Sequence, residues 1–210
     1  MQDSFAASRR WVRPLLVVLA AAILLTLGFA GGTLYSRLST PDTNSAEAGF
    51  ARDMSRHHAQ AVDMSWIAYP KATRPEVRTM ALDIATAQEY QIGVMQTWLK
   101  TWHLERNTER PAMAWMPNGT KELTPDGLMP GMATDAELNA LRTATGKDVD
   151  ILFCQLMLRH HLGGIHMVDG LLAQSHDPGV RELALMMRVG QTHEVTIMQD
   201  LLTDLGASPK

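Results

Sequence analysis

The chain has 210 residues, of which 46% are hydrophobic and 20% charged, as in an ordinary globular protein, and its formal net charge at pH 7 is −3. Residues 1–37 contain four arginines against one aspartate, so the remainder carries a net charge of −6, which excludes the basic surface that nucleic-acid binding requires. The single cysteine, Cys154, excludes an intramolecular disulfide framework and a Cys-x-x-Cys redox or zinc site.

The first predicted element is an apolar segment, residues 14–36, which contains no charged residue. About 20 apolar residues suffice to cross a bilayer, so we expect a transmembrane anchor here. Three arginines precede the segment and one follows it, which places residues 1–13 in the cytoplasm and the rest of the chain outside the cell membrane. A cleaved signal peptide, and hence a secreted protein, is the alternative, with Gly28 and Ala30 before the cleavage point. Residues 37–46 are small and polar and are expected to form a tether.

A long internal repeat follows the tether. Residues 50–99 and 153–202 align without a gap, at an offset of 103 residues, and 15 of the 50 pairs are identical. A repeat of this length means that both halves adopt the same supersecondary unit and that each half covers the apolar face of the other.

Each repeat contains two predicted helices joined by a short turn. In the first repeat, Tyr69 and Pro70 end one helix, and Thr73 with Glu76 forms a predicted capping box for the next. In the second repeat, the last helix is predicted to begin at Pro178. The apolar stripe of the first helix has spacings of three and four, which exclude a strand. That stripe consists of Phe50, Met54, His57, Ala61, Met64 and Ala68.

The connection between the repeats, residues 104–147, is rich in proline and glycine and is too long for one tight loop. A short helix is predicted at its end, with a capping box formed by Thr134 and Glu137. Two helical hairpins predict an all-α fold, a four-helix bundle over residues 47–206. Methionines in the connection are expected to pack over the open end of the bundle, with copper capture as the alternative. They are Met113, Met116, Met129 and Met132.

The repeat places a pair of histidines, flanked by methionines, at the same point in both halves. At about 100° per residue, the first histidine of each pair lies within the buried face of its helix and the second lies on the border of that face. If the halves pack about a pseudo-twofold axis, the two faces meet and supply metal ligands from both sides. The predicted ligands are His57, His58, His160, His161, Met54, Met64, Met157 and Met167.

Polar residues interrupt the apolar stripes of the second and fourth predicted helices. An unpaired polar group in a core costs roughly 1–3 kcal/mol, so these side chains need partners, and the histidines are the obvious ones. Two methionines follow them on the same stripes. The residues expected around the histidines are therefore Gln88, Gln91, Gln191, Glu194, Met95 and Met198.

This layer has two interpretations. In the first, it is a buried polar network that fixes the register of the helices, with methionine as flexible filler. In the second, it is a metal site in which imidazole and thioether bind the ion, while Gln or Glu holds the imidazole tautomer. Methionine together with histidine suits Cu(I), whereas Cu(II) uses the nitrogens. The spacing alone does not decide between the two interpretations.

Residues 47–206 resemble the CopM-like domain-of-unknown-function family. This resemblance implies a secreted or membrane-anchored bacterial protein with a ferritin-like four-helix fold, and copper binding, because some members bind copper in the periplasm. Two departures from the family pattern are Gln91, where glutamate is common, and Gly164, which replaces an alanine; the first makes a hard-metal site less favourable. The motifs are Asp53-Met54-x-x-His57-His58-x-x-Ala61-x-x-Met64, Gln88-x-x-Gln91-Ile92-x-x-Met95, Met129-Pro130-Gly131-Met132, Met157-x-x-His160-His161-x-x-Gly164-x-x-Met167 and Gln191-x-x-Glu194-Val195-x-x-Met198.

No enzyme is predicted. The sequence lacks the Glu-x-x-His pairs of di-iron bundles, a Walker loop, a Gly-x-Ser-x-Gly elbow and a dinucleotide-binding turn. The leading hypothesis is a membrane-anchored, extracytoplasmic protein that sequesters or transfers copper. The alternative is a structural or interaction module whose polar layer only specifies packing. The sequence leaves a homodimer open.

Overall fold

The structure is a computed structural model that describes the backbone of residues 4–209 and the side chains of residues 14–33 and 40–209. Within these residues it contains six α-helices, one 3-10 helix and no strand, which confirms the all-α prediction. The chain divides into two compact units, an N-terminal unit of residues 1–41 and a helical domain of residues 42–210.

The N-terminal unit is one long helix, α1 (Ser4–Ser39). Its residues Pro14–Thr33 have a mean hydropathy of 2.4 and are long and apolar enough to cross a membrane. A helix of this kind at the N-terminus fits a signal peptide or a transmembrane anchor. Because α1 continues to Ser39, only residues 40–45 of the predicted tether are non-helical. Residues 1–3 of the predicted cytoplasmic segment lie outside the described residues.

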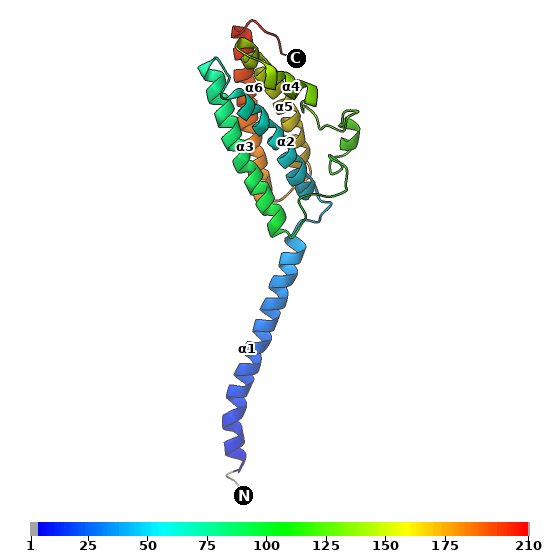
Figure 1. The fold of residues 1–210 in the computed structure, drawn as a ribbon. Helices are drawn as coiled ribbons and strands as arrows, with labels where there is room; N and C mark the ends of the chain where they lie inside the picture. Colours follow the sequence, from blue (N-terminus) through cyan, green and yellow to red (C-terminus); the bar gives the residue numbers. More distant parts are fainter. Residues whose placement is uncertain (1–3, 210) are drawn as a thin grey trace. The chain divides into compact units, whose positions relative to one another are not determined.

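Four long helices form the helical domain and lie side by side, each antiparallel to its neighbours (Figure 1). They are α2 (Ala46–Ala68), α3 (Pro75–Thr101), α5 (Lys147–Leu172) and α6 (Pro178–Asp204). Helix α2 packs against α3 and α5, and α5 also packs against α6, whereas α3 and α6 touch each other at few places. The predicted hairpins are therefore α2–α3 and α5–α6, and the two hairpins meet mainly through α2 and α5.

The start of α3 differs from the prediction. Helix α3 begins at Pro75, but Thr73 and Glu76 form no capping box. The hydroxyl and the backbone N–H of Thr73 instead donate to the buried carboxylate of Asp150 in α5, with 3.0 Å between the backbone nitrogen and Oδ1. A partner from another helix replaces the local cap, and this contact ties the turn of the first hairpin to the second hairpin.

The segment that connects α3 to α5 contains a 3-10 helix (Gly119–Glu122) and the short helix α4 (Asp135–Thr143). The predicted capping box of Thr134 and Glu137 is confirmed at the start of α4. Glu137 also receives two hydrogen bonds from Arg159 of α5, at 2.8 and 2.7 Å. These contacts hold α4 against α5, and the segment before α4 runs along the outside of α2 and α5 (Figure 1).

Residues 129–133 of this segment, here called the strap, lie across α2 and α5. Gln60 of α2 holds one end of the strap, because its amide donates to the Ala133 carbonyl at 2.9 Å and accepts from the Ala133 N–H at 2.7 Å. On α5 the strap needs a residue without a side chain, since a Cβ at Gly163 would lie 2.0 Å from the Pro130 carbonyl oxygen. The strap therefore closes the α2–α5 seam at the level of the histidines.

Candidate metal centre

Four of the eight histidines are buried, and they are the four that the repeat preserves. Their exposed fractions are at most 1%. The prediction that the second histidine of each pair lies on the border of the buried face is wrong, because α3 and α6 cover these side chains as fully as the first ones. The buried set is His57, His58, His160 and His161, and the exposed set is His103, His166, His176 and His193.

The first histidines of the two pairs meet at the centre of the domain. The ring centroids of His57 on α2 and His160 on α5 are 3.8 Å apart, with 34° between the ring planes. The ring of His161 follows at 6.4 Å from that of His160. The two faces that the repeat duplicates are thus brought together inside the helical domain, as the pseudo-twofold packing predicts.

The second histidines make equivalent hydrogen bonds in the two halves. Nε2 of His58 lies 2.7 Å from the amide oxygen of Gln91, and Nε2 of His161 lies 2.6 Å from a carboxylate oxygen of Glu194. Both acceptors require the proton on Nε2, so Nδ1 of each ring keeps its lone pair. Neither Nδ1 atom has a hydrogen-bond partner, and both are buried.

The strap breaks the equivalence for the first histidines. Nε2 of His57 donates to the carbonyl oxygen of Pro130 at 3.0 Å, which again leaves a buried Nδ1 without a partner. The strap supplies no such carbonyl to the other half, and in His160 it is Nε2 that is buried without a partner. Each of the four imidazoles therefore presents one unpaired ring nitrogen inside the domain.

Burial lowers the pKa of His57, His58 and His160, so these three imidazoles are neutral at neutral pH. Desolvation lowers the pKa of His57 to about 4, and the hydrogen bond to Pro130, which raises this pKa, offsets only part of the effect. Desolvation, followed by the neighbouring His57, lowers the pKa of His58 to about 3. The pKa of His160 is also lowered well below its ordinary value by burial and by the surrounding histidines. The neutral ring is the form that binds a metal ion.

Two of the polar residues predicted around the histidines form no hydrogen bond with them in the described part of the chain. Gln88 and Gln191 are buried, yet the Oε1 atom of each has no partner and neither side chain bonds to a histidine. A Cβ at Gly164 would lie 2.5 Å from the Oε1 atom of Gln191, which is the end of a flexible side chain. Of the four predicted polar partners, Gln91 and Glu194 thus hold histidines.

The six predicted methionines are all fully buried and lie in two groups. The sequence placed two methionines of one helix beside one histidine pair, but the antiparallel packing of α2 and α5 assigns them to different groups. The repeat offset converts each group into the other. The first group is Met54, Met95 and Met167, and the second is Met64, Met157 and Met198.

Three methionines of the connecting segment join the core that contains the first group. Met113, Met116 and Met129 are at most 8% exposed. Their burial agrees with packing against the helices, although Met129 lies in the strap at the level of the histidines and not at an end of the domain. Their burial gives an ordinary structural reason for methionine in a segment rich in proline and glycine.

Sequence reasoning missed the strap carbonyl. The sequence drew attention to Met129 and Met132 for their sulfur, whereas it is the Pro130 backbone oxygen that contacts the histidine layer. A backbone carbonyl is present in every residue, so no residue type indicates which carbonyl accepts a hydrogen bond. The available signal was the pair Gln60 and Gly163, which are equivalent in the repeats. Gln60 has a long polar side chain and Gly163 has none, and this difference indicates that another segment of the chain packs against the two helices in different ways.

Within the described part of the chain, no three side chains of His, Cys, Asp or Glu are grouped so that they could hold one ion. Nitrogen and carboxylate ligands alone therefore do not form a cage here. The donor types that the interior does offer are imidazole nitrogen and thioether sulfur, which favour soft and borderline metals over hard ones.

The chain is similar to several proteins of known structure. None of the curated proteins matches the chain. A DUF305 protein from Streptomyces coelicolor is 42% identical, with a TM-score of 0.73 over 80% of this chain and 99% of that one. A DUF305 fragment from Deinococcus radiodurans is 30% identical, with a TM-score of 0.64 over 76% of this chain and 96% of that one.

CopM, solved in a Cu(I)-bound form, is 27% identical, with a TM-score of 0.57 over 76% of this chain and 96% of that one. CopM has also been solved with Cu(II), with silver and without metal. Residues 47–202 match the domain of unknown function DUF305. The chain therefore belongs to the DUF305 family, which includes CopM-like proteins.

Proposed function

We propose that this protein is an extracytoplasmic copper-binding protein that sequesters the ion or hands it on. The observation that carries the proposal is the set of four buried imidazoles, each with one ring nitrogen that lacks a partner. An unpaired polar atom in a core is costly, and a cation bound to such a nitrogen, with thioether sulfur as a further ligand, would remove that cost by accepting the lone pair. The CopM structures with Cu(I) and Cu(II) support copper as that cation.

The residues that would hold copper are the histidines of the layer and the methionines on either side of it. Thioether sulfur favours Cu(I), and the imidazoles also suit Cu(II). Gln91 and Glu194 would hold the tautomers of their histidines. Gln88 and Gln191, one turn earlier on the same helices, form no hydrogen bond with a ring in the described part of the chain. The ligands are His57, His58, His160 and His161 with Met54, Met64, Met157 and Met167, and Met95 and Met198 complete the two methionine groups.

We infer further that the four long helices form a ferritin-like four-helix bundle and that residues 14–36 anchor it to the cell membrane. The length and hydropathy of Pro14–Thr33 support the anchor. The three arginines before it support an extracytoplasmic helical domain. A signal peptide is the alternative, and the mass of the protein purified from its native cells distinguishes the two, because cleavage would remove about the first 30 residues.

The copper proposal is tested by comparing two sets of histidines in the full-length protein, purified in detergent and exposed to copper. The buried-set variant H57A/H58A/H160A/H161A is expected to retain no copper in metal analysis. The exposed-set variant H103A/H166A/H176A/H193A removes the same number of imidazoles and is expected to retain as much as the wild type. Undiminished copper in the buried-set variant would remove the proposed ligands.

Loss of four buried histidines could also unfold the domain, so a second variant keeps the proposal testable. M54L/M64L/M157L/M167L preserves side-chain volume while it removes four sulfur atoms. This variant is expected to fold and to bind Cu(I) at least tenfold more weakly than the wild type. Equal Cu(I) affinity in the leucine variant would exclude methionine ligands.

The competing function is a helical module whose polar layer only specifies packing. The hydrogen bonds to Gln91, Glu194 and Pro130 favour it, because they give three of the histidines a structural partner. Thermal unfolding separates the two functions. A ligand that binds only the folded protein adds about 2.7 kcal/mol of stability at 100 times its Kd, so copper is expected to raise the melting temperature. An unchanged melting temperature would favour the packing module.

A further inference from the structure

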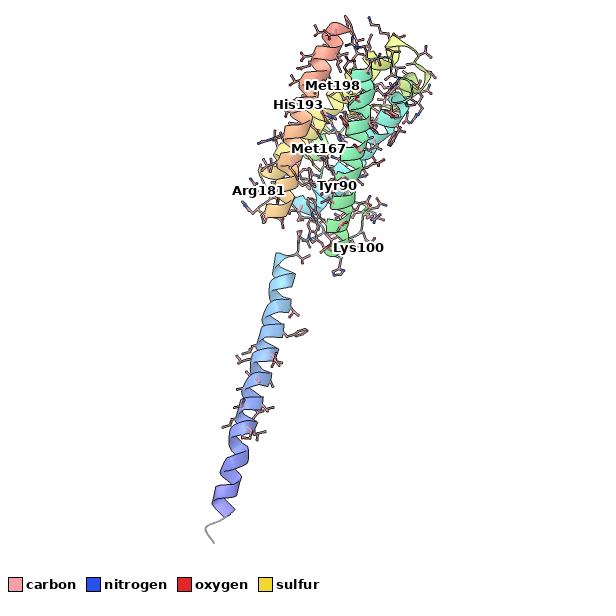
Figure 2. All side chains as sticks on the ribbon, turned by 90° about the vertical axis from the view of Figure 1, so that its left-hand side faces the viewer. Tyr90, Lys100, Met167, Arg181, His193 and Met198 are labelled. Atoms are coloured by element: carbon pink, nitrogen blue, oxygen red, sulfur yellow. The ribbon has the colours of Figure 1, made fainter. Side chains whose placement is uncertain are left out.

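Helices α3 and α6 leave a groove between them, with a volume of about 530 Å³. Its walls are the first turns of α3 and the part of α6 around Glu194. Glu76, Asp83 and His193 line it and are exposed, and its lining contains no lysine or arginine. Figure 2 looks onto the side of the molecule that carries α3 and α6 and labels His193 on α6. The groove is thus an acidic depression on an accessible face of the helical domain.

Two side chains connect this groove with the buried layer. Glu194 lines the groove with 23% of its side chain exposed, and the same carboxylate accepts the hydrogen bond from fully buried His161. Met80 lines the groove at 7% exposure and belongs to the core cluster that contains the second methionine group. The groove is therefore lined by the residue that holds His161 and by a methionine of the core cluster to which the second methionine group belongs.

The internal repeat provides a comparison for these residues. The repeat offset maps each of them onto a position toward the other end of α3 and α6, and none of those positions carries a charge or a histidine. The pairs are Glu76 with Gly179, Met80 with Leu183, Asp83 with Met186, His193 with Tyr90, and Glu194 with Gln91. The layer is duplicated, but its acidic access is found on one side only.

We propose that this groove is the opening through which the copper cation enters and leaves the histidine layer; the inference rests on the proposed function. Carboxylates at a concave surface raise the local concentration of cations and the rate of their capture. In the described part of the chain Asp83 forms no ion pair, whereas Glu76 is paired with Arg74 at 3.2 Å and Glu194 with His161 at 2.6 Å. Asp83 therefore contributes an uncompensated negative charge, and His193 and Met80 line the same groove with an imidazole and a thioether.

The test measures the rate of Cu(I) uptake by the full-length protein in detergent, with Cu(I) supplied as its bicinchoninate complex in a stopped-flow instrument. The groove variant is E76Q/D83N, and neither residue belongs to the proposed metal centre. The matched control is E109Q/D126N, which removes two exposed carboxylates from the connecting segment. A third variant, M80L, places at the groove the side chain that the repeat has at position 183.

At low ionic strength, E76Q/D83N is expected to take up copper about fivefold more slowly than the control, and the difference should shrink as salt is added. M80L should slow uptake at every salt concentration. The amount of copper bound at equilibrium should be the same in all three variants. Equal uptake rates in E76Q/D83N and E109Q/D126N would overturn the access role of the groove. No uptake by the wild type would instead contradict the proposed function.

Discussion

The two repeats agree within the histidine layer. His58 with Gln91 in the first repeat corresponds to His161 with Glu194 in the second, and the two hydrogen bonds differ by only 0.1 Å, at 2.7 and 2.6 Å. The methionine groups obey the same relation, since one becomes the other through the repeat offset. The histidines and methionines have kept their identity in both repeats, whereas the acceptor of the second histidine is an amide in one repeat and a carboxylate in the other.

The repeats differ where the connecting segment touches them. Asp53 of α2 accepts hydrogen bonds from the Met113 N–H at 2.7 Å and from the Trp115 indole at 2.9 Å, and its equivalent on α5 is Leu156. The protein has one connecting segment and two repeats, so a residue of one repeat contacts this segment while the equivalent residue of the other repeat does not make the same contact. The connecting segment is therefore one source of the asymmetry of the domain, and it reaches the layer through the hydrogen bond between His57 and Pro130.

The largest expected effect tests whether the layer acts as one unit. Folding holds the pKa of His57 at about 4 and that of His58 at about 3, whereas an unfolded histidine titrates near 6.5. As the pH falls below 6.5, protons bind the histidines of the unfolded chain before those of the folded chain. The free energy of unfolding is therefore highest above pH 6.5 and decreases as the pH falls from 6.5 to the folded pKa values. The loss is about 2 kcal/mol per histidine between pH 6.5 and pH 5.

Urea unfolding of the metal-free protein at pH 7 and pH 5 measures this loss. The variants H57Q and H160Q sharpen the comparison, because each removes the first histidine of one repeat. Both are expected to reduce the acid sensitivity of the free energy of unfolding by similar amounts. A change confined to H57Q would mean that the Pro130 contact, rather than burial in the shared layer, determines the response.

A second prediction concerns Asp53, the residue of α2 that holds the connecting segment. D53L gives α2 the residue that α5 has, and it leaves the N–H groups of Met113 and Trp115 without their buried acceptor. We expect a loss of about 3 kcal/mol in the free energy of unfolding. The control is L156M, which changes the equivalent residue of α5 while it keeps an apolar side chain. Thermal unfolding of both variants gives the answer, and a D53L protein as stable as L156M would contradict the role of Asp53.

The smallest expected effect compares adjacent glycines of α5. G163A directs a methyl group at the Pro130 carbonyl, a backbone atom at 2.0 Å, so the strap must move at a cost of about 1–2 kcal/mol. G164A meets the side chain of Gln191, which can rotate, and alanine is favoured over glycine in a helix by about 1 kcal/mol, so the net change should be near zero. Chemical denaturation measures both. A G164A protein less stable than G163A would reverse the assignment.

Sequence reasoning predicted the parts of the structure that depend on periodicity. The stripe that contains His57 and the repeat that contains His160 were enough to predict the helices and the burial of the first histidine of each pair, whereas the burial of the second histidines was not predicted. The capping box at Thr134 was also readable, because both of its partners lie within one helical turn.

The rest depends on contacts between distant segments. Thr73 has a suitable local partner in Glu76 but binds Asp150, and no spacing reveals that competition. The two methionine groups result from the antiparallel packing of α2 and α5, which brings Met54 near the end of α5 that carries Met167 and Met64 near the end that carries Met157. The Pro130 carbonyl is invisible in the sequence because every residue has such an oxygen. Local signals therefore gave the helices and the donor atoms, and the packing decided which donors meet.

Each methionine group draws two side chains from one repeat and one from the other. A protein cut back to a single repeat would consequently lose both groups, and not one of them. A lone hairpin with these residues could rebuild the missing contacts only by pairing with an identical hairpin in the antiparallel sense. The covalent link between the repeats thus replaces what would otherwise be a concentration-dependent association.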